Sequence, residues 1–290
     1  MPELPEVEVI ARLIGDAVRG STIESTLAPG INALKTFDPP LHALAGAEVT
    51  GLRRRGKLLL LDADSPEHGH LTLLVHLMNA GRLQLFETRA SLRDRTSRVL
   101  LRLGDGRELR LREFGSKQAA WARLLTLEGL KADETLGKLG PEAWPDPPAA
   151  ASLAERLAAE GARPLHSVLR DQSVLTGIGR TWVDEILHAA KLSPFKRGDD
   201  LSPREAGALR TAMVDELQRG VEHYDAIFAI PVPDKIPKPA LVHGHQGEPC
   251  PRCETVLEAV FFEDYVMTYC PHCQTGGRIL KDRRLSRILK

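Results

Sequence analysis

The chain has 290 residues, of which 42% are hydrophobic and 27% charged, and its 39 basic and 39 acidic residues give a formal net charge of zero. This composition excludes a disordered chain, a collagen and a disulfide-stabilised miniprotein, and the length is sufficient for about two domains. The densest aliphatic run, Leu58–Leu61, is too short to cross a membrane. Because the start, MPELPEVEVI, carries three glutamates and lacks the basic segment of a signal peptide, we expect a cytoplasmic protein.

The N-terminal half is predicted to be one helix followed by strands. An apolar stripe at helical spacing marks the helix, and its members are Leu4, Val7, Ile10, Ile14 and Val18. From Thr22 to Leu125, short apolar runs are separated by Gly, Asp and Pro, which is typical of an antiparallel β-sandwich. The expected strands are Lys57–Asp62, Leu71–Leu77, Arg82–Phe86, Val99–Leu103 and Glu108–Leu111. Asp105-Gly106 has the composition of a hairpin turn between the last two.

The C-terminal half follows a proline-rich linker at residues 140–148 and is predicted to be helical. The expected helices are Ser152–Glu160, Pro164–Arg170, Thr181–Ala190 and Ser202–His223. The last has a strong start signal, because Ser202 suits the N-cap, Pro203 the first helical position and Glu205 the capping box. A second proline-rich loop, residues 230–239, leads into a segment that contains all the cysteines.

The four cysteines form two pairs, Cys250-Pro-Arg-Cys253 and Cys270-Pro-His-Cys273. A two-residue gap lets one turn present two thiolates to one ion, and structural zinc sites take four such ligands. Segments 256–262 and 266–269 are rich in β-branched and aromatic residues and predict a hairpin with Glu263-Asp264 at its turn. Two disulfides are disfavoured in a cytoplasmic protein, and the four thiolates leave no ligand position for the nearby histidines at 243, 245 and 272. The pattern therefore predicts a zinc ribbon with one structural Zn²⁺.

The N-terminus also has the composition of a nucleophilic site. Removal of Met1 would expose the secondary amine of Pro2, and an α-amine titrates near about 8, well below the value of about 10.4 for lysine. A neutral amine can attack an aldehyde-level carbon, and Glu3 and Glu6 are close in sequence as candidate proton carriers. The same residues also suit an ordinary helix start.

Basic residues are concentrated in three segments, although the net charge is zero. Residues 89–117 carry nine basic and four acidic side chains, and further clusters occupy residues 53–57 and the tail from residue 278. Such segments fit either a groove that faces phosphates or a solvated surface in which nearby acids balance the charge.

A series of short motifs runs along nearly the whole chain. They are Met1-Pro-Glu-Leu-Pro-Glu-Val-Glu8, Arg54-Arg-Gly-Lys57, His76-Leu77, Arg112-Glu-Phe-Gly115, Asp171-Gln172, Thr176-Gly-Ile-Gly179, Asp184-Glu185, Gly247-Glu-Pro-Cys250 and Cys270-Pro-His-Cys-Gln274. In content and order, this series resembles the formamidopyrimidine-DNA glycosylase/endonuclease VIII family. The first motif combined with the C-terminal ribbon makes the resemblance highly specific.

The resemblance implies a bifunctional DNA glycosylase and abasic-site lyase. Pro2 would attack C1′ of the damaged nucleotide, Glu3 would act as acid and base in opening the sugar ring, and Glu6 would support them. Lys57 would hold the phosphate of the lesion and assist the later steps, although a lysine there also suits the end of an apolar strand. The Schiff base would then allow β-elimination, followed by δ-elimination.

The resemblance also implies how DNA is held. One set of residues would fill the space that the everted base leaves, and the glycine-rich turn of a helix–two-turn–helix motif would meet a phosphate. Without the resemblance, these residues suit core packing and an ordinary turn between helices. The residues expected to contact DNA are Asn79, Arg112, Phe114, Gly177, Gly179 and Arg180.

Four features depart from the pattern of the family. Arg180 stands where the family has asparagine, and Tyr265 stands where the ribbon has arginine. Met78 comes one place early, so that Asn79 takes the void-filling position. Residues 226–239 do not resemble the loop that covers 8-oxoguanine in purine-specific members.

The implied substrate is an oxidised purine of the formamidopyrimidine or 8-oxoguanine type, because the Pro-Glu-Leu-Pro-Glu start resembles that branch. The alternatives are an oxidised-pyrimidine glycosylase of the endonuclease VIII type, a non-catalytic protein that binds abasic or damaged DNA, and a zinc-ribbon protein of RNA binding or translation. The expected partner is double-stranded DNA with damaged bases or abasic sites; we expect a monomer and no membrane contact.

The expected fold is therefore a multidomain α+β protein with an N-terminal helix and antiparallel β-sandwich, a helical domain with a helix–two-turn–helix motif, and a zinc-ribbon hairpin. The predicted domain limits are residues 1–138, a linker at 139–151, residues 152–240 and residues 241–290.

Overall fold

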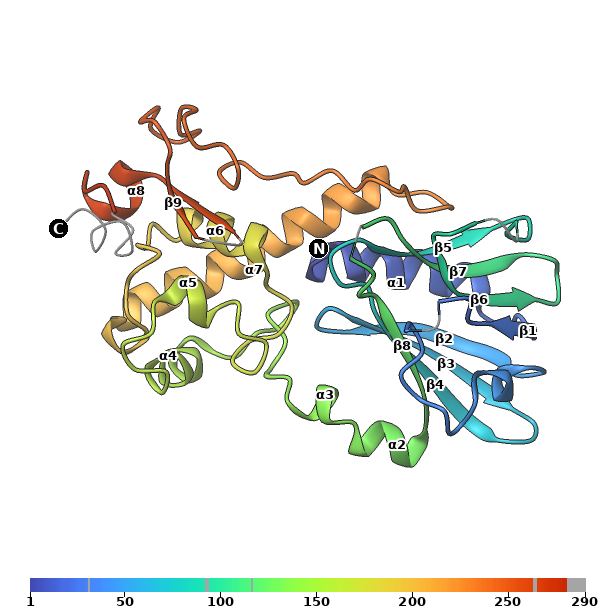
Figure 1. Cartoon of the computed structure of the whole chain (residues 1–290). Helices are drawn as coiled ribbons and strands as arrows, with labels where there is room; N and C mark the ends of the chain where they lie inside the picture. The colour runs from blue at the N-terminus through green and yellow to red at the C-terminus, as the bar shows by residue number, and fades with distance from the viewer. Residues whose placement is uncertain (31, 92–93, 116, 263–264, 281–290) are drawn as a thin grey trace. The chain divides into compact units, whose positions relative to one another are not determined.

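The computed structural model describes residues 1–30, 32–91, 94–115, 117–262 and 265–280 (Figure 1). The chain forms two compact units, and each draws on two stretches of sequence. Unit 1 comprises Met1–Lys138 and Val221–Ile236, and unit 2 comprises Leu139–Gly220 and Pro237–Lys290. The predicted turn at Glu263-Asp264 and the tail from residue 281 lie outside the described residues. The proposed limits of separate helical and ribbon domains remain a prediction.

Helix α1 (Leu4–Val18) carries the predicted apolar stripe, and all five members of the stripe are fully buried. The helix packs against strand β2 (Glu48–Arg55). The close approach is possible because Gly15 has no Cβ. A Cβ at this position would lie only 3.1 Å from the carbonyl oxygen of Leu52. The stripe therefore determines which face of α1 meets the sheet.

Two four-stranded antiparallel sheets make up the body of unit 1 (Figure 1). One has the order β1-β6-β7-β5 and the other β2-β3-β4-β8. A small apolar cavity is lined by residues of both sheets, among them Leu61, Leu73, Leu101 and Leu109, so the sheets face each other across the core. The remaining strands are β1 (Ile23–Leu27), β3 (Leu58–Ser65), β4 (Gly69–His76), β5 (Gly81–Phe86), β6 (Ser97–Leu103), β7 (Glu108–Glu113) and β8 (Trp121–Thr126).

The five predicted strands and the sandwich are confirmed. Gly106, with φ of +94°, occupies the predicted turn between β6 and β7. Sequence analysis did not single out β1, β2 and β8, nor the short helices η1 (Leu41–Leu44), α2 (Leu127–Ala132) and α3 (Glu134–Gly137). These segments are short or, in β2, rich in arginine, so they lack the apolar run on which the prediction depended.

Unit 2 contains the predicted helices. They are α4 (Ala150–Ala158), α5 (Leu165–Val168), α6 (Arg180–Ala189) and α7 (Pro203–Ile227), with a 3₁₀ turn, η2 (Gly198–Asp200), before α7. The segment 164–170 forms only a single helical turn, shorter than predicted. The capping box is confirmed, because Glu205 N–H donates to Ser202 Oγ and Ser202 N–H donates to Glu205 Oε2. The far end of α7, from Val221, belongs to unit 1.

The predicted C-terminal hairpin is also confirmed. Strands β9 (Glu258–Phe261) and β10 (Val266–Tyr269) pair antiparallel, and α8 (Pro271–Thr275) begins directly after Cys270. In the part of the chain that the structure describes, no helix combines the length and apolar character needed to cross a membrane.

Candidate functional site

The first turn of α1 buries the three N-terminal residues that sequence analysis selected. Pro2 is buried, and Glu3 and Glu6 are 2% and 0% exposed. Glu3 is the N-cap of the helix, and its backbone N–H donates to Glu6 Oε2 at 3.2 Å. The hydroxyl of Tyr224 donates to the other oxygen, Glu6 Oε1, at 3.2 Å. Two donors thus fix the Glu6 carboxylate one turn from Pro2.

Lys57 lies in the two-residue turn between β2 and β3, because Arg55 pairs directly with Leu58. Gly56, the other turn residue, has a φ of +57°, a conformation that favours glycine. Arg54 joins this turn to α1, since its Nε donates to Glu8 Oε2 at 2.8 Å and its Nη1 donates to the Gly56 carbonyl at 3.1 Å. Arg54, whose side chain is 6% exposed, therefore places the Lys57 turn beside the first turns of α1.

His76 ends strand β4 and lies opposite Leu58, the residue after Lys57. Burial, together with the positive charge of Lys57, lowers the pKa of His76 to about 4. Its Nδ1 accepts the N–H of Met78 at 2.9 Å, so the proton of the neutral ring lies on Nε2. The ring stacks on Trp121 with centroids 5.7 Å apart. His76 is thus a neutral N–H donor near a lysine.

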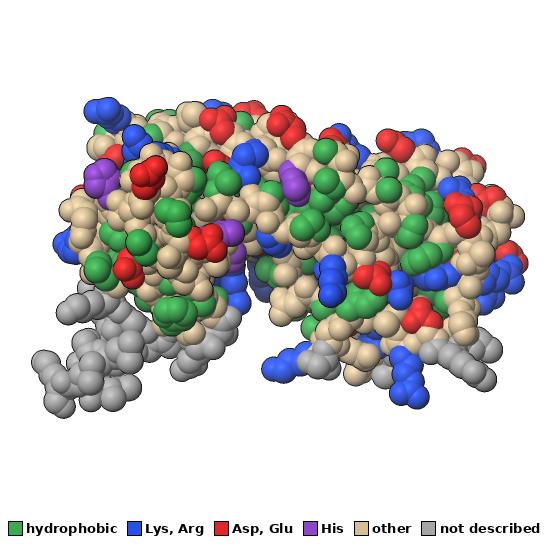
Figure 2. Space-filling view, turned by 90° about the horizontal axis from the view of Figure 1, so that it is seen from above, with side chains coloured by type: hydrophobic (Ala, Val, Ile, Leu, Met, Phe, Trp, Pro, Cys, Tyr) green, Lys and Arg blue, Asp and Glu red, His purple; other side chains and the backbone are tan. Residues whose placement is uncertain are grey.

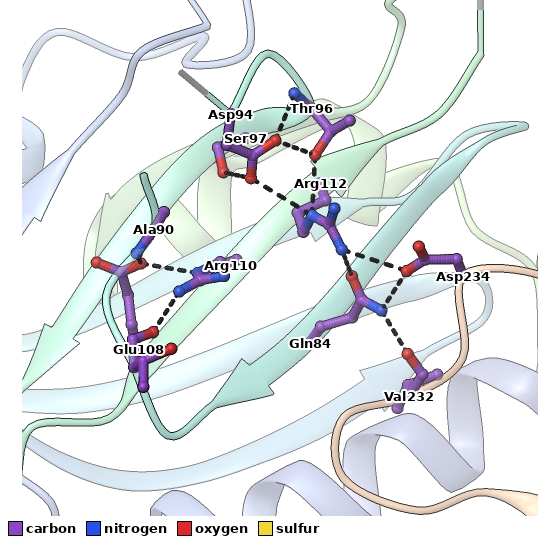
Figure 3. A network of polar contacts seen from close by, with 11 residues as sticks. Gln84, Ala90, Asp94, Thr96, Ser97, Glu108, Arg110, Arg112, Val232 and Asp234 are labelled. Atoms are coloured by element: carbon purple, nitrogen blue, oxygen red, sulfur yellow. Dashed lines mark hydrogen bonds and ion pairs between the residues drawn. The ribbon is translucent and has the colours of Figure 1, made fainter. Parts of the chain in front are cut away.

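Arg112 lies on β7 and is enclosed by hydrogen-bond partners (Figure 3). Its Nη1 donates to Gln84 Oε1 at 3.1 Å and to Asp234 Oδ1 at 3.2 Å, and its Nε donates to Thr96 Oγ1 at 2.9 Å. Asp94 lies 3.6 Å from the same Nε and forms an ion pair with it. Arg112, the residue expected to bond an orphaned base, therefore forms its hydrogen bonds with other protein side chains in this structure.

The segment that carries Asp234 is attached to strand β5. The side chain of Gln84 donates to the Val232 carbonyl and to Asp234 Oδ1, and Arg82 Nε donates to the Asp234 carbonyl at 3.1 Å. Burial lowers the pKa of Arg82, while the negative charges of Glu6 and Asp234 partly offset this effect. Arg82 therefore links the Asp234 segment electrostatically to the first turn of α1.

Asn79 and Phe114 belong to two neighbouring loops. The backbone N–H of Phe114 donates to the Ala80 carbonyl at 3.2 Å, which joins the end of β7 to the loop of residues 77–80. Asn79 is exposed in that loop, and Phe114 is 38% exposed, so Phe114 is not a core residue. The Arg112 guanidinium lies 4.7 Å from the centroid of the Phe114 ring. The structure thus brings the three predicted void-filling residues into one region of unit 1.

The glycine-rich turn precedes α6 in unit 2. Gly177 has a φ of +106°, and its N–H donates to Gln172 Oε1 at 2.9 Å, while Gly179 is the N-cap of α6. Both glycines are buried, whereas Arg180 is exposed at the first helical position. The side chain of Arg180 is therefore accessible to solvent, next to two buried glycines.

Most of the basic segment 89–117 is neutralised by nearby acids. Six of its arginines form ion pairs: Arg89 with Glu24, Arg98 with Glu113, Arg102 and Arg110 with Glu108, Arg107 with Asp105, and Arg112 with Asp94 and Asp234. The face in Figure 2 likewise shows acidic and basic side chains interspersed. For these arginines, the structure favours a balanced surface over a groove that faces phosphates.

The four cysteines form a metal site in unit 2. All four sulfurs lie within 4.8 Å of one another, and Cys253 Sγ is 3.5 Å from Cys270 Sγ and 3.4 Å from Cys273 Sγ. Four thiolates about 2.3 Å from a tetrahedral Zn²⁺ are spaced about 3.8 Å apart, so the donors fit zinc. The cysteines provide much of a small core that also contains Val242 and Leu257. The predicted structural zinc site is confirmed.

Sequence reasoning did not single out Arg82, Tyr224 or Asp234. Tyr224 and Asp234 form hydrogen bonds with the selected residues Glu6 and Arg112, and Arg82 interacts electrostatically with Glu6. Tyr224 and Glu6 are 218 positions apart, and Asp234 and Arg112 are 122 positions apart. Neither partner lies within a recognisable local motif. Only the spatial neighbourhood of Glu6 and Arg112 identifies these residues.

Comparison with known proteins gives matches along most of the chain. The formamidopyrimidine-DNA glycosylase N-terminal domain matches residues 1–116, the H2TH domain of the same enzymes matches residues 139–230, and the zinc finger found in FPG and IleRS matches residues 247–276. A formamidopyrimidine-DNA glycosylase of Moorella thermoacetica is 36% identical over 90% of this chain and 94% of its own length. One of Geobacillus kaustophilus is 33% identical over 94% of this chain and 100% of its own length.

Solved structures show the same fold. The Lactococcus lactis Fpg (MutM) in complex with DNA containing N7-benzyl-Fapy-dG has a TM-score of 0.81 at 23% identity, and covers 94% of this chain and 100% of its own. A complex of MutM with DNA containing carbocyclic 8-oxo-G has a TM-score of 0.81 at 24% identity, with the same coverage. The sandwich, the helical segment and the ribbon of this chain therefore belong to a fold known from these structures.

Proposed function

The chain belongs to the formamidopyrimidine-DNA glycosylase family, and from this premise we propose that it excises damaged bases from double-stranded DNA and cleaves the strand at the resulting abasic site. The observation that supports the proposal most is the buried first turn of α1, which holds Pro2, Glu3 and Glu6 together. A relative that is 36% identical over 90% of this chain carries the name formamidopyrimidine-DNA glycosylase, which supports the excision step.

The nucleophile is the Pro2 nitrogen after removal of Met1. An α-amine titrates near about 8, so a fraction in the neutral form with a free lone pair is present near pH 7. The nitrogen bonds to C1′ of the deoxyribose as the bond to the base breaks, and the base leaves with the electron pair and takes up a proton from water. The Pro2 nitrogen, now positively charged, gives up its own proton to the Glu3 carboxylate. Glu3 delivers a proton to the ring oxygen as the C1′–O4′ bond opens, which leaves an iminium between Pro2 and C1′.

Strand cleavage follows from the iminium. Its positive charge acidifies the C2′ proton, and loss of that proton sends an electron pair toward C3′ and expels the 3′ phosphate. A second elimination expels the 5′ phosphate, and water then hydrolyses the iminium and restores the amine. Lys57 holds the phosphate of the lesion through its charge, and the neutral His76 beside it supplies an N–H donor without a second positive charge.

A base within a duplex must be everted before Pro2 can reach its sugar. Asn79 and Phe114 take the vacated space, and Arg112 bonds the orphaned base once it exchanges Asp234 for that base. The preferred lesions are oxidised purines, as the start of the chain indicates. Arg180 meets a phosphate at the start of α6, and the zinc ribbon provides a second contact with the backbone.

The test of the covalent step is reduction with sodium borohydride on a duplex that contains one abasic site. The wild-type protein should give a covalent protein–DNA adduct, and Pro2→Gly should lose most of it. Glu3→Gln should slow base excision by about 10²–10⁴-fold, the usual contribution of a general acid. Pro5→Ala, in the same helical turn, is the matched control and should trap normally. If wild-type protein without Met1 gives no adduct, the proposal fails.

The test of the substrate is a panel of duplexes that each carry one defined lesion. We expect incision at formamidopyrimidine and 8-oxoguanine to exceed incision at oxidised pyrimidines. Faster incision at oxidised pyrimidines would contradict the purine preference, and binding without incision on every duplex would indicate a non-catalytic damage-binding protein. The elimination products, separated on a sequencing gel, distinguish a β- from a δ-endpoint.

A further inference from the structure

The C-terminal end of α6 contacts the first pair of zinc ligands through one residue, His188. Its Nε2 atom lies 3.3 Å from Sγ of Cys250. The backbone carbonyl of the same histidine accepts a hydrogen bond from Nη1 of Arg252 at 2.8 Å, and Arg252 lies between the two cysteines of the pair. His188 thus meets the turn from Cys250 to Cys253 with both its ring and its backbone.

The second pair of ligands is attached to the chain just after α6. The side-chain amide of Gln274 donates to the Leu192 carbonyl at 2.9 Å, and its Oε1 accepts the backbone N–H of Cys270 at 2.8 Å. Leu192 follows the last residue of α6, Ala189, by three positions. Both cysteine pairs are therefore held against one short segment, residues 188–192.

The chemistry of the ligands fixes the direction of the bond between His188 and Cys250. Cysteine binds zinc as the thiolate, and a thiolate has no proton to donate. The ring nitrogen is therefore the donor when the metal is bound, and Nε2 carries the hydrogen. Both the neutral and the protonated ring can carry a hydrogen on Nε2, so the direction does not depend on the charge of His188.

A buried donor matters at this position because the metal site has an excess of negative charge. Four thiolates outnumber the two positive charges of Zn²⁺. Cys250 and Cys270 are 1% and 0% exposed, so their sulfurs depend on protein donors rather than on water. The backbone N–H of Cys273 donates to Cys270 from within the ribbon, at 3.4 Å. For Cys250, His188 supplies a side-chain donor from α6, and this donor is itself only 6% exposed.

We propose that His188 is a positioning residue of the zinc site: it donates a hydrogen bond from Nε2 to the Cys250 thiolate and thereby strengthens the retention of Zn²⁺. Partners that orient a metal ligand commonly contribute about 10- to 100-fold in metal affinity. The inference extends beyond base excision and does not depend on it, because it concerns only the four cysteines and α6. Sequence analysis considered the histidines at 243, 245 and 272 near this site, whereas the structure assigns this role to a histidine 62 positions before Cys250.

The first experiment measures the Kd for Zn²⁺ by competition between the zinc-loaded chain and a chromogenic chelator under reducing conditions. His188→Phe keeps a ring of similar size and removes the donor, so it should raise the Kd by about 10- to 100-fold. His188→Gln keeps an N–H donor of similar reach and should retain most of the wild-type affinity. Equal losses in the two variants would assign the effect to packing of the imidazole ring and would overturn the proposal.

The second experiment reports on the sulfur itself, with Co²⁺ in place of zinc. A Co²⁺–thiolate site absorbs light by transfer of charge from sulfur to the metal. An N–H donor lowers the energy of the sulfur lone pair, so its loss in His188→Phe should shift this band to longer wavelength. His188→Gln should keep the band at the wild-type position. An unchanged band in His188→Phe would overturn the proposal even if the variant lost zinc more easily.

Two further variants separate donation from general destabilisation. His188→Leu also lacks a donor but differs in shape from phenylalanine, and its Co²⁺ band should shift in the same direction; a band at the wild-type position would contradict the proposal. His245→Ala removes a histidine that pairs with Glu248 in the same unit, and it should change neither the Kd nor the band. A shift in His245→Ala as large as that in His188→Phe would overturn the assignment to His188. Neither measurement uses DNA, so the result is independent of whether base excision is found.

Discussion

Arg112 and Asp234 are joined by a hydrogen bond of 3.2 Å between Nη1 and Oδ1, although they are 122 positions apart in the sequence. Asp234 lies in the loop that departs from the family pattern, and Arg112 is the residue proposed to bond the orphaned base. The carboxylate therefore occupies a donor that the base would need. Under the proposed role of Arg112, binding of a lesion would exchange one partner for the other.

We predict that Asp234→Ala raises the affinity for a duplex with a damaged base by about two- to fivefold, because Asp234 is 53% exposed and such ion pairs contribute less than about 1 kcal/mol. Fluorescence anisotropy of a labelled duplex measures the effect. In the Arg112→Ala background, Asp234→Ala should bring no gain in affinity, since the donor for which Asp234 and the base compete is absent. A gain that persists without Arg112 would show that Asp234 acts elsewhere.

His76 provides a prediction for pH dependence. Its pKa of about 4 in the folded protein lies below the value of about 6.5 expected in the unfolded chain. The unfolded chain therefore binds more protons between these two values, so this residue reduces stability as the pH falls from about 6.5 to about 4 and has no effect above that range. NMR titration of the His76 ring should show no protonation above pH of about 5.

The contribution of Lys57 to that pKa is separable. Lys57→Gln removes a positive charge and should raise the pKa of His76, while burial keeps it below the unfolded value. Lys35→Gln, in the same unit, is the control and should leave the titration unchanged. A His76 pKa that does not move in Lys57→Gln would contradict the placement of Lys57 beside the histidine.

The sequence predicted those parts of the fold that local patterns encode. The stripe from Leu4 to Val18 repeats at helical spacing, and the Ser202–Glu205 box involves residues three positions apart, so both are readable in a short window. Strand β2 was missed because its polar side chains are satisfied only after folding. Arg53 donates to Asp62 on the neighbouring strand, and Arg54 donates to Glu8 in α1.

The same distinction applies to the candidate site. The residues of the N-terminal motif lie close to one another in the chain, as do the two cysteines of each pair, and the structure places each set together. The partners of Arg112 and Cys250 come from distant segments and depend on tertiary packing. Sequence reasoning therefore selected Arg112 without its binding partner Asp234, and it selected Cys250 without the histidine at position 188.

The zinc site leads to a stability prediction. The core around the four cysteines contains few other apolar residues, so the ribbon depends on the metal for its folding. Cys253→Ser should release zinc, expose the ribbon to proteolysis and abolish DNA binding. His245→Ala is the control, because His245 pairs with Glu248 and should leave one zinc per chain, as measured by mass spectrometry under native conditions. Unchanged DNA binding in zinc-free Cys253→Ser would contradict a role for the ribbon.

Gly81 lies directly after residues 77–80, the loop that carries Asn79. A substitution at Gly81 should therefore affect both the stability of unit 1 and the proposed eversion step. A Cβ at this position would lie 2.3 Å from the carbonyl oxygen of Leu77, and the N–H of Gly81 donates to that same oxygen. Gly81→Ala must therefore displace the 77–80 loop that carries Asn79, and it should lower the free energy of unfolding by about 1–3 kcal/mol, as measured in urea. Gly207→Ala, in the second turn of α7 with open space around the new Cβ, should be neutral or up to about 1 kcal/mol more stable.

The functional consequence of Gly81→Ala separates eversion from strand cleavage. At a temperature where the variant is fully folded, displacement of Asn79 should slow excision of a damaged base, because the vacated space is filled less well. Cleavage at a preformed abasic site should be affected much less, since no base remains to be everted. Equal losses on the two substrates would mean that the loop supports the catalytic end of α1 rather than the eversion step.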